Sequence, residues 1–367
     1  MKKLLLLAGE QSGVIYSERI AGRVRQMYPG VEIRGYSDYG FSIADLAVFG
    51  FWEVLKRIFF FMKVRKTMER AIDEWRPDAV CTVDYPGMNL RLCSYAKKNG
   101  IRAVHVVCPQ VWAWRSGRIP KIEASLNALC CFFPFEPRLF TPSFAHFIGH
   151  PLVEEFSSSA SVEREKKLVA LMPGSRLGEI SRILPVLLEA VKGVDCRVIV
   201  PAANERAKTL IEKIVLKSSV PVEVRLGGAR DVLSRAACAV AASGTVTLEA
   251  ALARCPTILV YKVGSVLAFF ARRVLNIKHV GLANIVWEKC SENADSQAVT
   301  CDRSVWGGYP MVELLQEDMT ADSVRKELKM LLSDDLRRKE IEKRLSMIAD
   351  FLRLDGDSIT KIVRFLV

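Results

Sequence analysis

The sequence lacks several features that define common protein classes. It has four histidines among 367 residues, and its ten cysteines form no C-x-x-C pair, so neither a zinc site nor a disulfide framework is predicted. No run of about 18 apolar residues occurs, so we predict no transmembrane helix. Neither G-x-x-x-x-G-K-S/T nor G-x-G-x-x-G is present, which argues against a P-loop nucleotidase and an ordinary dinucleotide-binding enzyme.

Acidic residues are also in short supply. The chain has 41 of them against 53 lysines and arginines, for a net charge of +12. Such a charge attracts nucleic acid, anionic membranes or phosphorylated ligands, unless it serves solubility alone. The aromatic residues gather in hydrophobic clusters and do not alternate along a basic surface. We therefore expect no nucleic acid partner.

Two stretches, 52–70 and 266–278, mix aromatic and basic side chains. The first contains Phe59, Phe60 and Phe61 beside several lysines and arginines, and the second repeats the pattern around Phe269 and Phe270. Basic amphipathic helices of this kind lie on anionic membrane surfaces. The alternative is a helix that packs on the core and exposes a basic face.

The cysteines and the first residues both indicate a reducing compartment. Several cysteines lie inside apolar, strand-like runs, as buried free thiols do: Cys81, Cys108, Cys130, Cys131 and Cys238. The opening MKKLLLLAGEQSG has too short an apolar run for a signal peptide and fits a first strand followed by a glycine-rich turn. We expect a cytoplasmic protein.

Short apolar runs alternate with helical patterns in two series. The first series of expected strands is 4–8, 31–35, 79–83, 103–107, 128–133 and 145–148, and the second is 167–172, 197–201, 222–226, 238–241 and 257–261. Continuous apolar strands alternating with helices predict parallel sheets covered on both faces. We therefore expect two doubly wound α/β domains, at 1–150 and 167–320, with a ligand cleft.

A polar, serine-rich stretch at 151–166 is interpreted as the linker between these domains. The tail 321–367 has the period of helices, and we expect it to pack back toward the first domain. Ligands of such domains bind at the carboxyl ends of strands, so the strand-to-helix turns are the informative places.

Three turns of the first domain carry candidate site residues. Glu10 stands between two glycines after the first strand, and Asp84 ends a buried strand just before Pro86. Each carboxylate serves either as a helix-terminal residue or as an acid or base facing the cleft. The stretch 108–118, CPQVWAWRSGR, contains Trp112 and Arg115, which either hold sugar or phosphate groups or pack as an ordinary loop.

Two turns of the second domain suggest a phosphate site. Gly174, Ser175 and Arg176 open one helix, and Ser243-Gly244-Thr245 open another. Uncapped N–H groups and the helix dipole make such turns anion sites, whereas Ser243 or Thr245 could instead cap the helix. We expect the second turn to do both.

Several motifs, taken together and in order, resemble those of lipid-A-disaccharide synthases, a family of inverting GT-B glycosyltransferases. The matching stretches are AGEQSG (8–13), LAVFGFWEVL (46–55), VDYPGMNLRL (83–92), CPQVWAWRSGR (108–118), FPFE (133–136), FIGHPLVEE (147–155), ALMPGSRLGEI (170–180), ASGTVTLEAALARCPTILVY (242–261), GLANIV (281–286) and VELLQED (312–318). They span nearly the whole chain.

The resemblance implies a reaction and a partner for each substrate. UDP-2,3-diacylglucosamine would be the donor and 2,3-diacylglucosamine 1-phosphate (lipid X) the acceptor, giving a β-1,6-linked disaccharide and UDP. It also implies that the protein associates peripherally with the anionic inner membrane. The expected reaction needs no cofactor or metal, and the protein could form a homodimer. Another GT-B enzyme on UDP-N-acetylglucosamine-type sugars and a non-catalytic relative are the alternatives.

The resemblance also assigns roles to residues. Asp84 would be the general base, with Glu10 second or positioning the acceptor, and Ser12 and Gly13 beside it. The donor diphosphate would be held by Gly174, Ser175, Arg176, Ser243, Gly244 and Thr245. Glu249 would accept from the ribose, and Asn284 would contact substrate.

The chain departs from the family pattern at several positions. Val14 and Gly87 each replace an aspartate, Ala283 replaces a proline, and the segment between Val286 and Tyr309 is longer than usual. None of these changes removes Asp84. They lie on the acceptor side and the rim, so we expect an altered preference for acyl chains.

Overall fold

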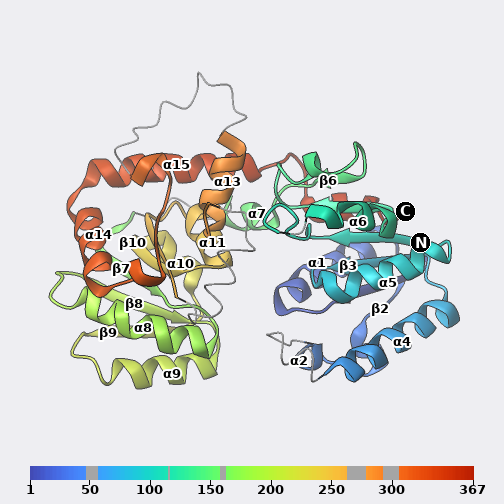
Figure 1. Ribbon diagram of the computed structural model, residues 1–367, viewed down its shortest axis with the longest axis horizontal. Helices are drawn as coiled ribbons and strands as arrows, with labels where there is room; N and C mark the ends of the chain where they lie inside the picture. Colours follow the sequence, from blue (N-terminus) through green and yellow to red (C-terminus); the bar gives the residue numbers. More distant parts are fainter. Residues whose placement is uncertain (47–56, 115, 158–162, 263–277, 292–305) are drawn as a thin grey trace. The chain divides into compact units, whose positions relative to one another are not determined.

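The computed structural model describes residues 1–46, 57–114, 116–157, 163–262, 278–291 and 306–367. The chain divides into unit 1, Met1–Pro151 with Leu354–Val367, and unit 2, Leu152–Arg353. Each unit holds a six-stranded sheet in which every neighbouring pair is parallel (Figure 1). The predicted pair of doubly wound parallel sheets is therefore confirmed.

Unit 1 has the strand order β2-β1-β3-β4-β5-β6. Its strands are β1 (Lys3–Ala8), β2 (Glu32–Arg34), β3 (Ala79–Val83), β4 (Arg102–Val106), β5 (Ala128–Cys131) and β6 (Ala145–Phe147). Its helices are α1 (Gln11–Met27), α2 (Ile43–Leu46), α4 (Ile58–Trp75), α5 (Pro86–Lys98), α6 (Ile119–Ser125) and α16 (Ser358–Arg364).

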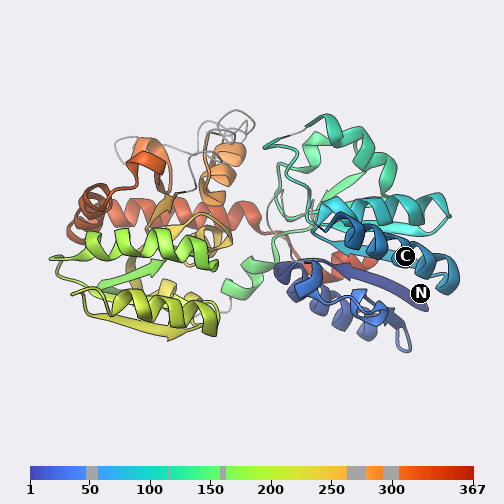
Figure 2. The ribbon, with the colours of Figure 1, turned by 60° about the horizontal axis from the view of Figure 1, so that its bottom comes forward.

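Two apolar clusters cover the faces of this sheet. One joins the strands to α4, α5 and α6 through residues such as Met68, Leu92 and Ile122. The other joins them to α1 and α16 through Ile20, Val24 and Ile362. The last helix of the chain thus packs beside the first, and both chain ends lie on unit 1 in both views (Figures 1 and 2).

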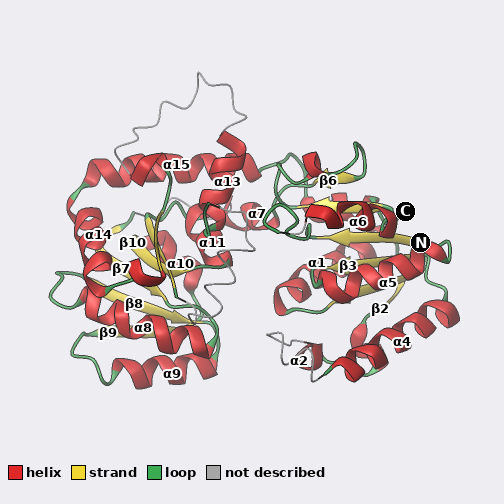
Figure 3. Cartoon of the chain, viewed as in Figure 1, coloured by secondary structure: helices red, strands yellow, loops and turns green. Residues whose placement is uncertain are grey.

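Unit 2 has the strand order β12-β11-β10-β7-β8-β9. Its strands are β7 (Glu165–Met172), β8 (Arg197–Ala202), β9 (Val222–Leu226), β10 (Ala236–Ala242), β11 (Thr257–Tyr261) and β12 (Val312–Leu315). Its helices are α8 (Leu177–Val191), α9 (Glu205–Val215), α10 (Ala229–Arg235), α11 (Thr245–Leu252), α13 (Leu282–Ser291), α14 (Ala321–Ser333) and α15 (Asp335–Leu352) (Figure 3).

The helices of unit 2 form two groups. Helix α8 contacts α9 and α14, whereas α11 contacts α10, α13 and α15. Right-handed crossovers that move along a sheet in opposite directions place their helices on opposite faces. The two groups are therefore the two outer layers around a buried sheet, and every residue of β10 is buried.

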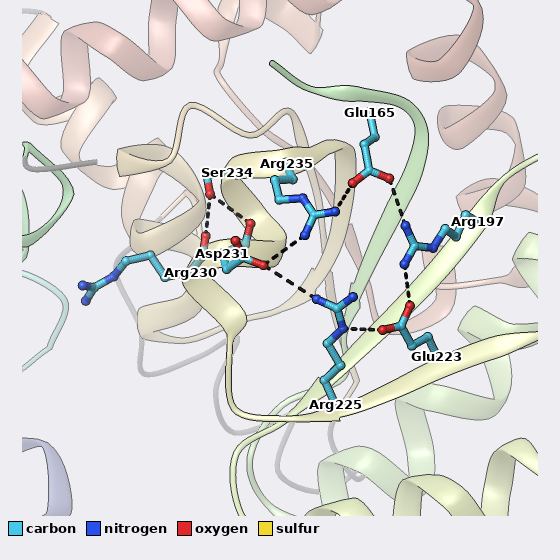
Figure 4. Close-up of polar contacts among 8 residues, drawn as sticks. All are labelled: Glu165, Arg197, Glu223, Arg225, Arg230, Asp231, Ser234 and Arg235. Carbon is cyan, nitrogen blue, oxygen red and sulfur yellow. Dashed lines mark hydrogen bonds and ion pairs between the residues drawn. The ribbon is translucent and has the colours of Figure 1, made fainter. Parts of the chain in front are cut away.

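Six charged side chains form a closed ring at one end of this sheet, each carboxylate lying between two guanidinium groups (Figure 4): Glu165, Arg197, Glu223, Arg225, Asp231 and Arg235. Arg197 lies 3.0 Å from Glu165 and 2.6 Å from Glu223. Hydrogen bonds from Arg225 and Arg197 lower the pKa of Glu223. Glu165 and Arg197 begin β7 and β8, so the ring ties the amino ends of the strands together.

The structure differs from the sequence-based expectations in three elements. Strand β12 (Val312–Leu315) was not among the expected strands, β7 begins at Glu165 and not at residue 167, and the expected linker contains helix α7 (Pro151–Ser157). The tail is helical, as predicted, and its last helix belongs to unit 1. The five cysteines expected to be buried are buried and free.

No helix among the residues described combines the length and the apolar character that a membrane span requires.

Candidate active site

The order of strands in unit 1 creates a switch point between β1 and β3. The chain passes from β1 to β2 on one side and then returns to β3 on the other side of β1. Ala8 pairs with Val83 at the carboxyl ends of these strands, and the candidates Glu10 and Asp84 follow directly. Ligands of doubly wound sheets bind at such a point. The fold therefore brings both predicted carboxylates to the carboxyl ends of two adjacent strands.

Asp84 sits in a strained turn. Asp84 and Tyr85 have φ angles of 51° and 52°, a left-handed conformation that is uncommon for two consecutive residues other than glycine. The Asp84 N–H donates to the Val106 carbonyl at 2.9 Å, and the Tyr85 N–H donates to Asp84 Oδ1 at 2.8 Å. The side chain is partly buried, and this burial raises the pKa of its carboxyl group.

Asn89, on α5, fixes the backbone of this turn through its side chain. Its buried carboxamide donates to the carbonyl oxygens of Asp84 at 2.7 Å and Val83 at 3.3 Å, and its Oδ1 accepts from the Tyr36 hydroxyl at 2.8 Å. We did not predict this residue. Its sequence signals are a polar side chain one turn into the helix that follows Asp84 and its place in the matching stretch VDYPGMNLRL.

Glycines let the chain pack closely beside Glu10. A Cβ at Gly9 would lie 2.4 Å from the Tyr85 ring, and a Cβ at Gly13 would lie 3.2 Å from the Val83 carbonyl oxygen. Glu10 is the N-cap residue of α1, and its side chain makes no cap hydrogen bond. Burial raises the pKa of the Tyr85 hydroxyl most, and the charge of Glu10 raises it further. Ser12 lies in the first turn of α1, and its side chain falls outside the described part.

The loop after β4 packs within unit 1 through Trp112, which was one of the two alternatives for this loop. The indole N–H of Trp112 donates to Glu136 Oε1 at 3.3 Å and its ring packs edge-on against Phe135, so Trp112 is engaged within unit 1. Its neighbour Trp114 is the more exposed, at 36%. Arg115 lies outside the described residues.

Glu136 is a second residue that sequence reasoning missed. It is 2% exposed, its Oε2 accepts from the Phe133 N–H at 3.1 Å, and burial raises its pKa to about 8. The thiols of Cys108 and Cys131 lie within 4.8 Å of its carboxylate oxygen and of each other. The buried carboxyl group of Glu136 thus ties the Trp112 loop to the segment that follows β5.

Unit 2 has its own switch point, between β7 and β10. Ala241 pairs with Met172, and the glycine turns 174–176 and 243–245 follow these two strands. Gly174 and Gly244 have φ angles of 104° and 149°, where only glycine is comfortable. The fold therefore brings the six predicted phosphate-binding residues to adjacent strand ends.

The two helices that start here lack side-chain caps. Gly244 is the N-cap residue of α11 and Arg176 is that of α8. At neither position does a side chain accept a hydrogen bond from the first-turn N–H groups of the helix. This corrects the expectation that Ser243 or Thr245 caps α11, because Ser243 Oγ instead donates to the Val280 carbonyl at 3.3 Å. By contrast, the Asn204 side chain caps α9 at 2.9 Å. Unpaired N–H groups at α8 and α11 are suited to an anion.

Polar side chains surround these helix starts. The side chain of Arg176 is 60% exposed and donates to Glu179 at 2.9 Å. Ser175 and Thr245 are exposed. Burial raises the pKa of Glu249, on α11, and the charge of Arg230 lowers it to a smaller extent.

Asn284 serves an internal purpose. It is 1% exposed, its carboxamide donates to the Met311 carbonyl and to Glu313, each at 2.9 Å, and its Oδ1 accepts from the Met311 N–H at 3.1 Å. Glu313 also accepts from the N–H groups of Val280 and Gly281 at the start of α13. In the structure Asn284 fastens α13 to β12, and its predicted contact with substrate stays a prediction.

Solved structures with the same fold include glycosyltransferases. MurG of Acinetobacter baumannii aligns with a TM-score of 0.58 at 12% identity, covering 100% of this chain and 99% of that one. The Staphylococcus aureus MnaA–UDP structure aligns with a TM-score of 0.60 at 13% identity, covering 99% and 95%. At these identities the likeness shows the fold, which is GT-B.

Sequence relatives are closer. A lipid-A-disaccharide synthase of Syntrophus aciditrophicus is 32% identical over 97% of this chain and 94% of its own length. That of Coxiella burnetii is 31% identical over 100% and 99%. The family model described as Lipid-A-disaccharide synthetase matches residues 4–356. The chain belongs to the lipid-A-disaccharide synthase family of GT-B glycosyltransferases.

Proposed function

We propose that this glycosyltransferase joins UDP-2,3-diacylglucosamine to 2,3-diacylglucosamine 1-phosphate. The acceptor hydroxyl attacks the anomeric carbon of the donor while the Asp84 carboxylate takes its proton. The bond from that carbon to the UDP oxygen breaks, and UDP leaves with the electron pair. The products are a β-1,6-linked disaccharide and UDP.

The observation that carries the proposal is the setting of Asp84. It follows β3 at the switch point of unit 1, its backbone is held by Asn89, and burial raises the pKa of its carboxyl group. A raised pKa makes a carboxylate a better proton acceptor. Glu10, after the neighbouring strand, is the second candidate for the base or a group that orients the acceptor.

The donor is assigned to unit 2. The uncapped starts of α8 and α11 and the exposed Arg176 would hold the diphosphate, with the hydroxyls of Ser175 and Thr245 completing its shell. Such preorganised donors also stabilise the charge that develops on leaving UDP, without a metal. Glu249 would accept a hydrogen bond from the ribose.

Helix α4 is proposed to rest on the anionic inner membrane. Phe59 is 81% exposed, Met62 50% and Ile58 46%, beside basic residues of the same helix. Exposed apolar groups with neighbouring cations favour an anionic lipid surface. Of the first stretch predicted to meet the membrane, residues 52–56 lie outside the described part, and so do residues 266–277 of the second.

UDP release tests the reaction. Purified protein in detergent should release UDP from UDP-2,3-diacylglucosamine only when 2,3-diacylglucosamine 1-phosphate is present. Release without acceptor, or release from UDP-N-acetylglucosamine alone, would point to a hydrolase or to another UDP-sugar enzyme. No release with several acyl lengths would favour a non-catalytic relative.

A further inference from the structure

Unit 1 contains a pocket of about 600 Å³ that none of the predicted site residues lines. Its walls are one face of α5 and one face of α6, with one residue from α4 and two from the segment between β4 and α6. The lining is Arg65, Pro86, Gly87, Leu90, Arg91, Ser94, Trp114, Arg118, Lys121, Ile122 and Ser125. A volume of this size is typical of a ligand pocket.

The helical period explains why these residues gather. Pro86, Leu90 and Ser94 follow each other at intervals of four on α5, and Lys121 and Ser125 do so on α6. Leu90 is 7% exposed and Ile122 is 1% exposed, so they belong to the apolar floor. The exposed ring of Trp114 adds a further apolar surface.

The rim is cationic. Arg65, Arg91, Arg118 and Lys121 line the pocket, and no aspartate or glutamate is among its described lining residues. Arg65 pairs with Glu69 at 2.7 Å. Arg91, Arg118 and Lys121 have no ion pair or side-chain hydrogen bond within the described parts of the chain. Three cations held around an apolar floor are complementary to an anionic amphiphile.

The pocket also adjoins the candidate base. Pro86 and Gly87 line it, and they begin α5 immediately after the Asp84–Tyr85 turn. A Cβ at Gly87 would meet nothing within 4 Å, so this position is open space where the family pattern has an aspartate. The missing carboxylate keeps the rim free of negative charge.

We propose that this pocket holds the phosphorylated acceptor, with an acyl chain on Leu90, Ile122 and Trp114 and the phosphate on Arg91, Arg118 and Lys121. This inference rests on the proposed function, whose acceptor carries both groups. It assigns the acceptor phosphate to α5 and α6 of unit 1 and separates it from the donor phosphates at α8 and α11 of unit 2.

The first test measures dodecyl phosphate binding by calorimetry, with inorganic phosphate and dodecyl maltoside as single-feature probes. Wild-type protein should bind dodecyl phosphate, and both single-feature probes should bind much more weakly. The double variant Arg91→Ala/Lys121→Ala should bind it at least about tenfold more weakly, because each cation supplies a charge-assisted bond. The variant Gly87→Leu should weaken it by filling the pocket.

The matched control is Lys98→Ala/Arg25→Ala, which removes two exposed cations of unit 1 that lie outside the pocket. It should leave binding unchanged. Equal binding by the pocket variants and this control would overturn the inference. The inference would also be overturned if the pocket variants lost binding to vesicles containing anionic phospholipid as strongly as they lost binding to dodecyl phosphate. The pocket would then bind the membrane surface and not the acceptor.

Kinetics separate this inference from the proposed function. The pocket variants should raise the KM for acceptor at least about tenfold and leave the KM for UDP-sugar unchanged. Wild-type turnover with unaltered KM values in the variants would overturn the pocket and leave the reaction standing. Absence of turnover in wild type, with dodecyl phosphate still bound through Arg91 and Lys121, would overturn the reaction alone.

Discussion

The carboxamide nitrogen of Asn89 lies 2.7 Å from the backbone carbonyl oxygen of Asp84, and the same side chain reaches the Val83 carbonyl at 3.3 Å. Asn89 is fully buried, so these bonds are shielded from water. A left-handed pair such as Asp84–Tyr85 persists only where its surroundings hold it. Asn89 is thus a positioning residue for the candidate base.

Asn89→Ala should lower kcat more than it raises either KM, because the base loses its position while the substrate contacts remain. It should also reduce the free energy of unfolding by about 1–3 kcal/mol, the cost of leaving buried carbonyl groups unpaired. Asn127→Ala is the control, since it removes a bond to the Ala103 N–H near the amino end of β4, whereas Asp84 follows the carboxyl end of β3. If both variants lose stability and keep kcat, Asn89 has a structural role only.

Arg176→Ala should weaken UDP binding about tenfold or more, because a charge-assisted bond to the diphosphate is lost. Stability should change little, since the side chain is 60% exposed. Calorimetry with UDP measures this effect. Arg206→Ala, in the first turn of the capped helix α9, should bind UDP as wild type does; equal losses in both variants would argue against the assigned phosphate site.

Glu136 predicts a pH dependence of stability. Its pKa is about 8 when folded against an ordinary value of 4.5, so the folded state holds this proton more tightly than the unfolded state. The contribution to stability is therefore full below pH 4.5 and is lost as the pH rises toward 8, at up to about 1.4 kcal/mol per pH unit.

Denaturant unfolding of wild type and Glu136→Gln over that range measures this loss. The glutamine variant cannot titrate at this position. The free energy of unfolding of wild type minus that of the variant should therefore fall as the pH rises and become constant above pH 8. A difference independent of pH would mean that Glu136 is charged in the folded protein.

Phe59→Ser/Met62→Ser should reduce binding to vesicles containing anionic phospholipid without loss of stability, because both side chains are exposed. Flotation of protein with vesicles measures the binding. Leu216→Ser removes a side chain that is 85% exposed on unit 2 and should leave it unchanged. Unchanged flotation of the α4 variant would remove α4 from the membrane contact.

Much of the fold follows from the sequence because buried parallel strands are continuous apolar runs. Strand β12 escaped prediction because its four residues are only half-buried and include Glu313. The two turns at each switch point were predictable from glycines and carboxylates at strand ends. Their grouping follows from strand order, which the sequence pattern alone does not determine.

The partners of individual side chains were less predictable. Asn89, Glu136 and Asn284 each have at least one partner more than 20 residues away in the sequence, and all three are buried. Asn284 lies 27 residues from the Met311 carbonyl that it binds. In the same way, Trp112 and Trp114 look equivalent in the sequence, but Trp114 lines the pocket between α5 and α6 and Trp112 does not.

The central claim is that Asp84 is the base, and Asp84→Asn tests it most directly. Acceptor-dependent UDP release should fall by about 10²- to 10⁴-fold, the usual contribution of a general base. Stability at neutral pH should hold or increase, because burial disfavours the charged carboxylate that the substitution removes. UDP release within a few fold of wild type would contradict the claim and move the base to Glu10.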